Sequence, residues 1–160
     1  SMAEAKAMGM DVLAYDMFCS DEAIKADGVT PTNSVEALYQ QSDIVSVHIP
    51  ATKETKQSIN FNLLSLMPKG AVLVNTARKE VIHNDELVKY MSENPSFKYM
   101  TDILPDNHAE MMEKFANRYF ATPKKMGAQT SEANVNAGIA AAKQIVDFFK
   151  NGNQRFRVNN

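Results

Sequence analysis

Short apolar runs that alternate with helical patterns most constrain the fold of this chain. Two such runs are Ile44–His48, closed by Pro50, and Ala71–Val74, and residues 60–66 between them have a helical pattern. Strands that alternate with helices imply βαβ crossovers and a parallel sheet. The strand cores are nearly continuously apolar, which is expected when both faces of a sheet are covered. The sequence therefore predicts an α/β protein with a doubly wound parallel sheet.

The same alternation extends along the whole chain. Strands are predicted at 11–15, 44–48, 71–74, 97–102 and 118–121, and helices at 3–8, 34–41, 60–66, 84–92, 108–117 and 130–150. The chain opens on the end of a helix, whereas a sheet of this kind normally has a strand before that helix. We therefore expect a partial domain over residues 1–150, without its first strand and the glycine-rich loop after it, and a polar tail over 151–160.

Composition excludes several functional classes. The formal net charge of −2 gives no strong attraction to nucleic acid or to an anionic membrane. The longest apolar runs are too short to span a bilayer. A single cysteine, Cys19, excludes an internal disulfide and fits a reducing, cytoplasmic compartment. No partner among nucleic acids or membranes and no metal site is expected.

Ligands of open parallel sheets lie beyond the carboxyl ends of the strands, so the residues that follow each strand are the candidate site. Asp16 follows the first visible strand, where an acidic residue of a dinucleotide fold binds the adenosine ribose. Residues 17–20 contain no Arg or Lys that would neutralise a 2′-phosphate, which favours NAD over NADP. The alternative is an exposed aspartate that merely ends a strand.

Later strands are followed by further polar residues. His48 and Pro50 follow the second strand and are candidates for a cofactor groove, or a simple turn. Arg78 follows the third strand, and its planar guanidinium can hold a carboxylate bidentately. A surface salt bridge to Glu80 is the alternative for Arg78.

The fourth and fifth strands continue the pattern, with Asp102 after one and the Lys124–Lys125 pair after the other. Each lysine taken alone is most simply a solvated loop residue. Charged residues at the ends of several strands of one sheet indicate a functional edge more strongly than any single one does.

These segments together resemble the D-isomer-specific 2-hydroxyacid dehydrogenases. The resemblance runs along nearly the whole chain, and its most specific parts are NTAR at 75–78 and GAQTSEANVN at 127–136. It implies a Rossmann-type NAD-binding domain that flanks a substrate domain, with the active site between them. It also implies a small-molecule substrate and a homodimer. The substrate domain is expected to be largely absent from this chain.

The resemblance assigns roles position by position. Asp16 corresponds to the ribose ligand, and Thr76 and Ala77 correspond to cofactor-contacting residues. Arg78 corresponds to the arginine that binds the substrate carboxylate, and Asp102 to the acidic residue near the nicotinamide.

The chain departs from the family pattern around the acid-base residues. Asn107 stands where the family has glutamate, and Lys125 stands where it has histidine, just before the cofactor-side residues Gly127 and Ala128. The spacing from the preceding proline is one residue longer than usual, so Lys124 remains an alternative to Lys125. Lys79 stands where the family usually has glycine after the arginine, which adds bulk and charge near the cleft.

The two acid-base departures are consistent with each other. A lysine has a free pKa of about 10.4, which must be lowered toward about 7–8 for a base at neutral pH. Burial or a nearby cation lowers it, whereas a glutamate partner would raise it. A neutral residue at Asn107 therefore suits a lysine base.

The resemblance favours an NAD-dependent oxidoreductase of D-2-hydroxy acids, and within the family the branch that oxidises D-3-phosphoglycerate to 3-phosphohydroxypyruvate in serine biosynthesis. A glycerate or hydroxypyruvate reductase is an alternative substrate class. An NAD-sensing scaffold that binds protein partners is an alternative of another kind. Residues 1–160 alone are expected to be inactive, because half of the cleft and the glycine turn are missing.

Overall fold

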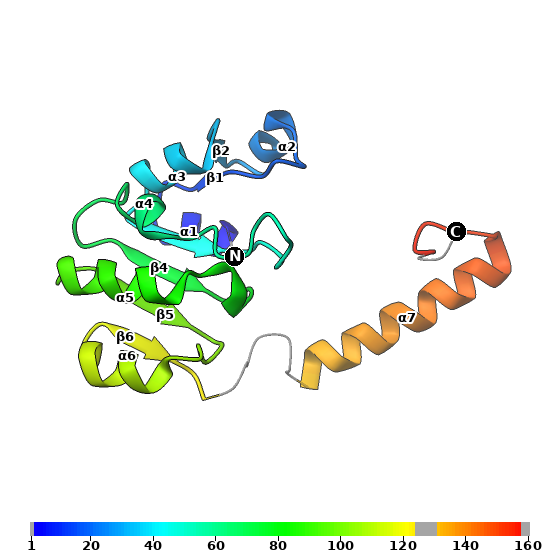
Figure 1. The fold of residues 1–160 in the computed structure, drawn as a ribbon. Coiled ribbons are helices and arrows are strands. Elements are labelled where there is room, and N and C mark those ends of the chain that lie inside the picture. Colours follow the sequence, from blue (N-terminus) through cyan, green and yellow to red (C-terminus); the bar gives the residue numbers. More distant parts are fainter. Residues whose placement is uncertain (1, 124–130, 158–160) are drawn as a thin grey trace. The chain divides into compact units, whose positions relative to one another are not determined.

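The computed structural model describes residues 2–123 and 131–157. It divides into two compact units, residues 1–123 and residues 124–160, and each is described by itself. The first unit contains all the strands of the described part and the second contains one long helix (Figure 1).

The strands of the first unit form two parallel sheets. One has the order β3-β4-β5-β6, and the other pairs β1 with β2. The strands are β1 (Leu13–Ala14), β2 (Thr30–Pro31), β3 (Ile44–Val47), β4 (Val72–Asn75), β5 (Lys98–Thr101) and β6 (Tyr119–Ala121). The predicted α/β class with a parallel sheet is confirmed.

Apart from α2, the helices follow the order that the sequence predicts. They are α1 (Met2–Ala7), α2 (Asp21–Ala26), α3 (Val35–Gln41), α4 (Phe61–Leu64), α5 (Asn84–Glu93), α6 (His108–Phe115) and α7 (Ser131–Asn151), with a 3₁₀ turn η1 at Lys79–Val81. Ser34 caps α3, since its hydroxyl accepts a hydrogen bond from the amide of Ala37 at 3.0 Å.

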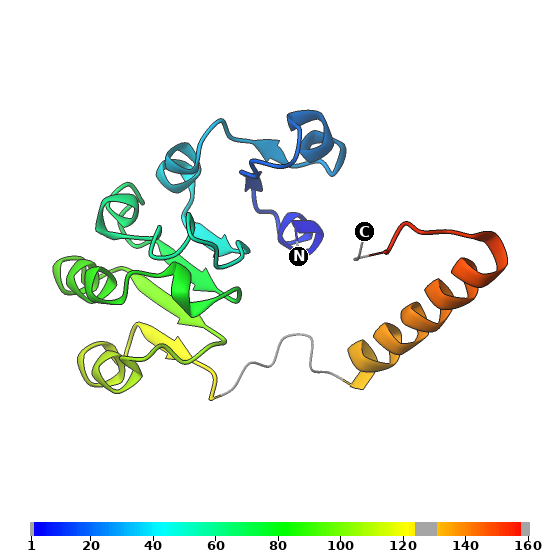
Figure 2. The ribbon, with the colours of Figure 1, turned by 45° about the vertical axis from the view of Figure 1, so that its right-hand side comes forward.

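The core lies between the four-stranded sheet and α4, α5 and α6, which share one side of it (Figure 2). Leu87 and Met91 of α5 are buried there, as the helical pattern predicted. The inward-facing residues of the sheet include Val45, Leu73 and Tyr99.

The opposite face of this sheet does not match the expectation that both faces would be covered. Residues alternate between buried and exposed along β3 and β5. The side chains of Ile44, Met100 and Phe120 are 50%, 41% and 60% exposed. The apolar runs predicted that both faces of the sheet would be buried. The helices α4, α5 and α6 all lie on one side of it, so the side chains on the opposite face are exposed.

Two elements were not predicted, α2 and β2. Ser20 caps α2 by accepting a hydrogen bond from the amide of Ala23, and Gly28 follows the helix with a positive φ of 70°. The strand β2 is only two residues long and contains Pro31, so it lacks the length and composition of a recognisable strand.

The second unit is described by α7, a 21-residue helix. Several apolar side chains along it are exposed, among them Val135, Ile139 and Phe149. Among the described residues, no helix combines the length and the apolar character that crossing a membrane requires.

Candidate functional site

The carboxyl ends of the four strands lie at one level of the sheet, because the strands are in register there. Val47 pairs with Asn75, Asn75 with Thr101, and Thr101 with Ala121. The residues that follow these strands therefore begin at a single edge, as expected for a ligand site of a parallel sheet. The predicted site residues brought to this edge are His48, Thr76, Ala77, Arg78 and Asp102.

A buried asparagine shapes the turn that carries Arg78. Asn75, the last residue of β4, has no exposed surface. Its Oδ1 accepts a hydrogen bond from the amide of Ala77 at 3.0 Å, and its Nδ2 donates to the carbonyl of Arg78 at 2.9 Å. One side chain thus holds both ends of the turn.

The turn leaves the Arg78 side chain exposed at the sheet edge. Its Nη1 donates to the carbonyl of Ala77 at 2.8 Å. No ion pair joins it to Glu80 in the described part of the chain, so the salt-bridge alternative gains no support. The guanidinium has five N–H donors, and this hydrogen bond uses one of them. The exposed side chain can therefore bind a carboxylate.

The segment after Arg78 is anchored to the strand-like segment before α4. The amide of Gln57 donates to the carbonyl of Glu80 at 2.9 Å, and Ile59 and Ile82 form a parallel bridge. Backbone pairing therefore fixes the chain as it leaves the site.

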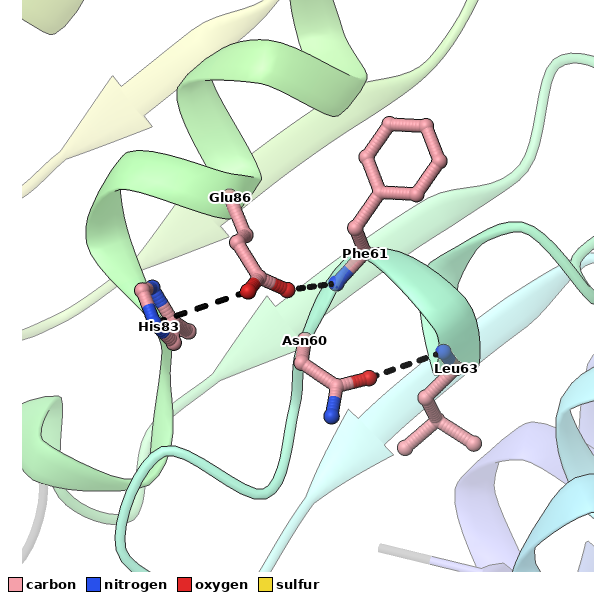
Figure 3. A network of polar contacts seen from close by, with 5 residues as sticks. All are labelled: Asn60, Phe61, Leu63, His83 and Glu86. Carbon is pink, nitrogen blue, oxygen red and sulfur yellow. Dashed lines mark hydrogen bonds and ion pairs between the residues drawn. The ribbon is translucent and has the colours of Figure 1, made fainter.

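A carboxylate reinforces this anchor (Figure 3). Glu86 Oε2 accepts a hydrogen bond from the amide of Phe61 at 2.7 Å, while Glu86 Oε1 lies 3.6 Å from His83 Nε2. Asn60 caps α4 through a 3.0 Å hydrogen bond from the amide of Leu63. The Glu86 side chain, near the start of α5, is thus hydrogen-bonded to the backbone at the start of α4.

A buried polar atom in the loop after β5, Asp102 Oδ1, has no hydrogen-bond partner within residues 2–123 and 131–157. Buried polar atoms are nearly always paired, so such an atom near a predicted site indicates a group that a ligand or a further part of the protein can satisfy. Thr101, which is buried, holds the start of this loop through its hydroxyl, which contacts both the amide and the carbonyl of Ile103 at 3.1 Å.

An ion pair connects the loops after β4 and β5. Lys79 Nζ lies 2.5 Å from Asp106 Oδ1. The hydrogen bond that Lys79 donates to Asp106, more than the charge of Asp106, raises the pKa of Lys79 above its ordinary value. The lysine that replaces the usual glycine is therefore engaged by a carboxylate.

The remaining predicted residues lie apart from these contacts. Asp16 follows β1 in the other sheet, and its Oδ1 accepts a hydrogen bond from the amide of Phe18 at 2.8 Å. His48 is exposed and its Nε2 lies 2.9 Å from the hydroxyl of Ser46. The carbonyl of Pro50 accepts a hydrogen bond from Thr55 Oγ1. Lys124, Lys125, Gly127 and Ala128 lie outside the described residues.

The described side chains suit NAD. Asp16 is exposed, and residues 17–20 contain no Arg or Lys. Thr76 and Ala77 follow β4 at the sheet edge, and Asp102, whose buried Oδ1 has no partner in the described part of the chain, lies just after β5. No group of three or more potential metal ligands occurs in the described ranges.

Sequence reasoning missed Asn75 and Thr101 as site residues. Both are the last residues of strands, and both are polar where the strand pattern calls for an apolar inward residue. That interruption of the apolar pattern is the signal that would have found them, because a buried polar side chain needs a partner.

A family comparison matches most of the chain. The model of the D-isomer specific 2-hydroxyacid dehydrogenase NAD binding domain matches residues 2–124. A D-3-phosphoglycerate dehydrogenase of Synechocystis is 34% identical over 145 residues, which are 89% of this chain and 26% of that protein. A glyoxylate reductase of Thermococcus litoralis is 30% identical over 146 residues, 91% of this chain and 44% of that protein.

A solved structure agrees with these sequence matches. The 3-phosphoglycerate dehydrogenase of Entamoeba histolytica, solved with NAD⁺ bound, is 40% identical with a TM-score of 0.84. The alignment covers 99% of this chain and 50% of that one. The chain therefore spans half or less of the length of these relatives.

Proposed function

Because the chain belongs to the D-isomer-specific 2-hydroxyacid dehydrogenases as an NAD-binding domain, we propose that its protein oxidises D-3-phosphoglycerate to 3-phosphohydroxypyruvate. The observation that carries the proposal is the turn in which buried Asn75 presents Arg78 at the sheet edge. The 40% identity to an NAD⁺-bound 3-phosphoglycerate dehydrogenase supports this substrate.

Arg78 binds the substrate carboxylate with its exposed guanidinium and so orients C2 and its hydroxyl. NAD, when bound, accepts the hydride that leaves C2. Asp16 holds the adenosine ribose, and Asp102 lies near the nicotinamide. His48, Pro50, Thr76, Ala77, Gly127 and Ala128 complete the cofactor contacts in this proposal.

Lys125 takes the proton of the hydroxyl as the general base, with Lys124 as the alternative. A lysine does so near neutral pH only if its pKa is lowered. Asn107 favours this because an amide carries no negative charge to stabilise the ammonium form.

The test uses the complete protein and compares Lys125→Ala with Lys124→Ala by NADH absorbance in the presence of D-3-phosphoglycerate. We expect Lys125→Ala to lower kcat by about 10²- to 10⁴-fold, the usual contribution of a general base. Lys150→Ala, at the end of α7, is the matched control. Rates near wild type in both variants would remove lysine from the mechanism.

Glyoxylate and related 2-keto acids are the second substrate class. The Thermococcus litoralis glyoxylate reductase, 30% identical, favours them. The same assay run in reverse, with NADH and glyoxylate or hydroxypyruvate, ranks the substrates by kcat/KM. An absence of turnover with all of them, together with NAD binding, would favour the scaffold alternative.

We further propose a homodimer in the cytoplasm that serves serine biosynthesis. The charge balance and the small-molecule substrate support this setting. Sedimentation of the complete protein would measure its oligomeric state.

A further inference from the structure

The ion pair between Lys79 and Asp106 joins two loops of the site that are far apart in sequence. Lys79 Nζ donates to Asp106 Oδ1 at 2.5 Å, across 27 positions of the chain. Lys79 directly follows Arg78, and Asp106 directly precedes Asn107. The contact therefore lies one residue from each of two residues that the proposed function uses.

Global stability is a poor explanation for this pair. The side chains of Lys79 and Asp106 are 36% and 76% exposed. Exposed ion pairs contribute little to stability, because water and salt screen them and two flexible side chains must be ordered. A small free energy is nevertheless enough to bias a local equilibrium between two loop arrangements, because a fivefold change in affinity corresponds to only about 1 kcal/mol.

The backbone contact between the ends of β4 and β5 is long, so it holds the two following loops together only weakly. Between the ends of β4 and β5, the amide of Asp102 reaches the carbonyl of Asn75 only at 3.4 Å. Asn75 fixes the Arg78 turn to its own strand, and Thr101 fixes the following loop to its own strand. The Lys79–Asp106 pair connects one loop to the other.

We propose that Lys79 and Asp106 are a positioning pair that holds the Arg78 turn against the Asn107 loop and thereby sets the geometry in which the carboxylate of the substrate is bound. This inference rests on the proposed role of Arg78. Lys79 remains charged in the pair, because both Asp106 and Glu80 favour its protonated form.

A direct role of Lys79 on a second anionic group of the substrate makes a different prediction. If Lys79 bound substrate, removing the charge of Asp106 would free the lysine and would leave binding unchanged or tighter. If the pair positions the loops, Lys79→Met and Asp106→Ala have the same effect, and the double variant is no worse than either.

The kinetic test uses the complete protein with Lys79→Met, Asp106→Ala, both together, and the reversed pair Lys79→Asp with Asp106→Lys. We expect each single variant to raise KM for the hydroxy acid about fivefold, with a smaller change in kcat and an unchanged Kd for NAD. The reversed pair should recover at least half of the lost affinity on a logarithmic scale. An unchanged KM in Asp106→Ala overturns the proposal.

The matched control is a second exposed lysine–carboxylate pair of the described residues, Lys114 with Glu110. It joins two residues of α6 at 2.7 Å, with exposures of 51% and 41%, and it connects no loops. Lys114→Met should leave KM as in wild type.

A second measurement separates failure of this inference from failure of the proposed function. In the 160-residue chain, backbone amide NMR signals of residues 76–78 should shift in Asp106→Ala and return toward wild type in the reversed pair. The same signals should not move in Lys114→Met. Unmoved signals in Asp106→Ala overturn the positioning pair even if the enzyme is active, whereas moved signals with an inactive enzyme count against the proposed function alone.

Discussion

Asn75 is the residue on which the shape of the candidate site most depends. It is fully buried at the end of β4, and both polar atoms of its side chain are used by the turn that follows. Arg78 is exposed and flexible by nature, so the direction from which it reaches a substrate is decided by the backbone that Asn75 holds. The buried Asn75 in the strand therefore determines how the exposed Arg78 in the loop is positioned.

Replacing Asn75 tests this dependence. Asn75→Ala removes two hydrogen bonds from a buried position and should lower the free energy of unfolding by about 2 kcal/mol. Urea denaturation followed by circular dichroism measures the loss. Asn151→Ala, which removes a hydrogen bond to Asp147 in an exposed position, is the control and should change stability by less than about 0.5 kcal/mol. Equal effects in the two variants would contradict the role of Asn75.

At this scale the sequence pointed to residues that follow the strands and passed over the buried polar residues that end them. Arg78 and Asp102, whose roles stay predictions, stand out by their place after strands, and Asn107 stands out by the resemblance. Asn75 and Thr101 did not, because their importance depends on which face of the strand they occupy, and that face is known only once the helices are placed. The roles of Lys124 and Lys125 stay predictions.

Among the elements, α4 and α5 are joined by a carboxylate that caps a helix other than its own. Glu86 belongs to α5, and its Oε2 accepts a hydrogen bond from the first amide of α4, that of Phe61. A helix of four residues satisfies few of its own amides, so an external acceptor matters more for it than for a long helix.

Substitutions of Glu86 should separate the hydrogen bond from the charge. Glu86→Gln keeps a carbonyl oxygen for the Phe61 amide, whereas Glu86→Leu removes the acceptor and should cost about 1–2 kcal/mol of unfolding free energy. Glu93→Leu, an exposed change on the same helix, is the control. If Glu86→Gln is as destabilising as Glu86→Leu in chemical denaturation, the charge and not the cap is responsible.

The strands β5 and β6 bring two buried phenols together. The rings of Tyr99 and Tyr119 are stacked with centroids 5.9 Å apart, and Tyr119 Oη lies 2.8 Å from His108 Nδ1. Burial first, and the neighbouring Tyr99 second, raise the pKa of Tyr119 to about 12.

This pKa shift predicts an alkaline loss of stability. An unfolded tyrosine ionises near pH 10, whereas folded Tyr119 stays protonated until about pH 12. The unfolded state therefore loses its proton first, and the stability due to this group is complete below about pH 10 and falls as pH rises to about 12. Urea midpoints of Tyr119→Phe should decline less steeply over this range than those of wild type. Exposed Tyr15→Phe should follow wild type, and a parallel decline in Tyr119→Phe would refute the assignment.

The predicted elements that match the structure best are those long enough to show a repeating apolar pattern. The helices α5 and α7 and the strands β3 and β4 fall close to their predicted ranges. The pair β1–β2 is two residues long on each side, so hydrogen bonding between the segments, which a local pattern does not contain, defines it.

At the scale of the whole molecule, the apolar core belongs to one of the two units. Its buried members all fall between Tyr39 and Tyr119. The sequence predicted a single partial domain over residues 1–150. The structure divides into two compact units after Pro123, and the domain boundary at residue 150 stays a prediction.

The location of the core predicts the result of shortening the chain. Residues 1–123 alone should unfold cooperatively, with a thermal midpoint within about 3 °C of the 160-residue chain, because no core residue is removed. Differential scanning calorimetry of both forms makes the comparison. A broad, non-cooperative transition in the shorter form would show that residues 124–160 are needed for folding.

The pleat of β4 carries a consequence for how the length of this chain can vary. Leu73 and Asn75 point inward while Val72 and Val74 alternate with them. Deleting or inserting one residue within the strand would exchange the two faces and turn Asn75 toward water. The hydrogen bonds of Asn75 that shape the turn before Arg78 would then be lost. Gains and losses of residues should therefore be tolerated only in the connecting segments, so new substrate preferences can arise there while the spacing from strand to arginine stays constant.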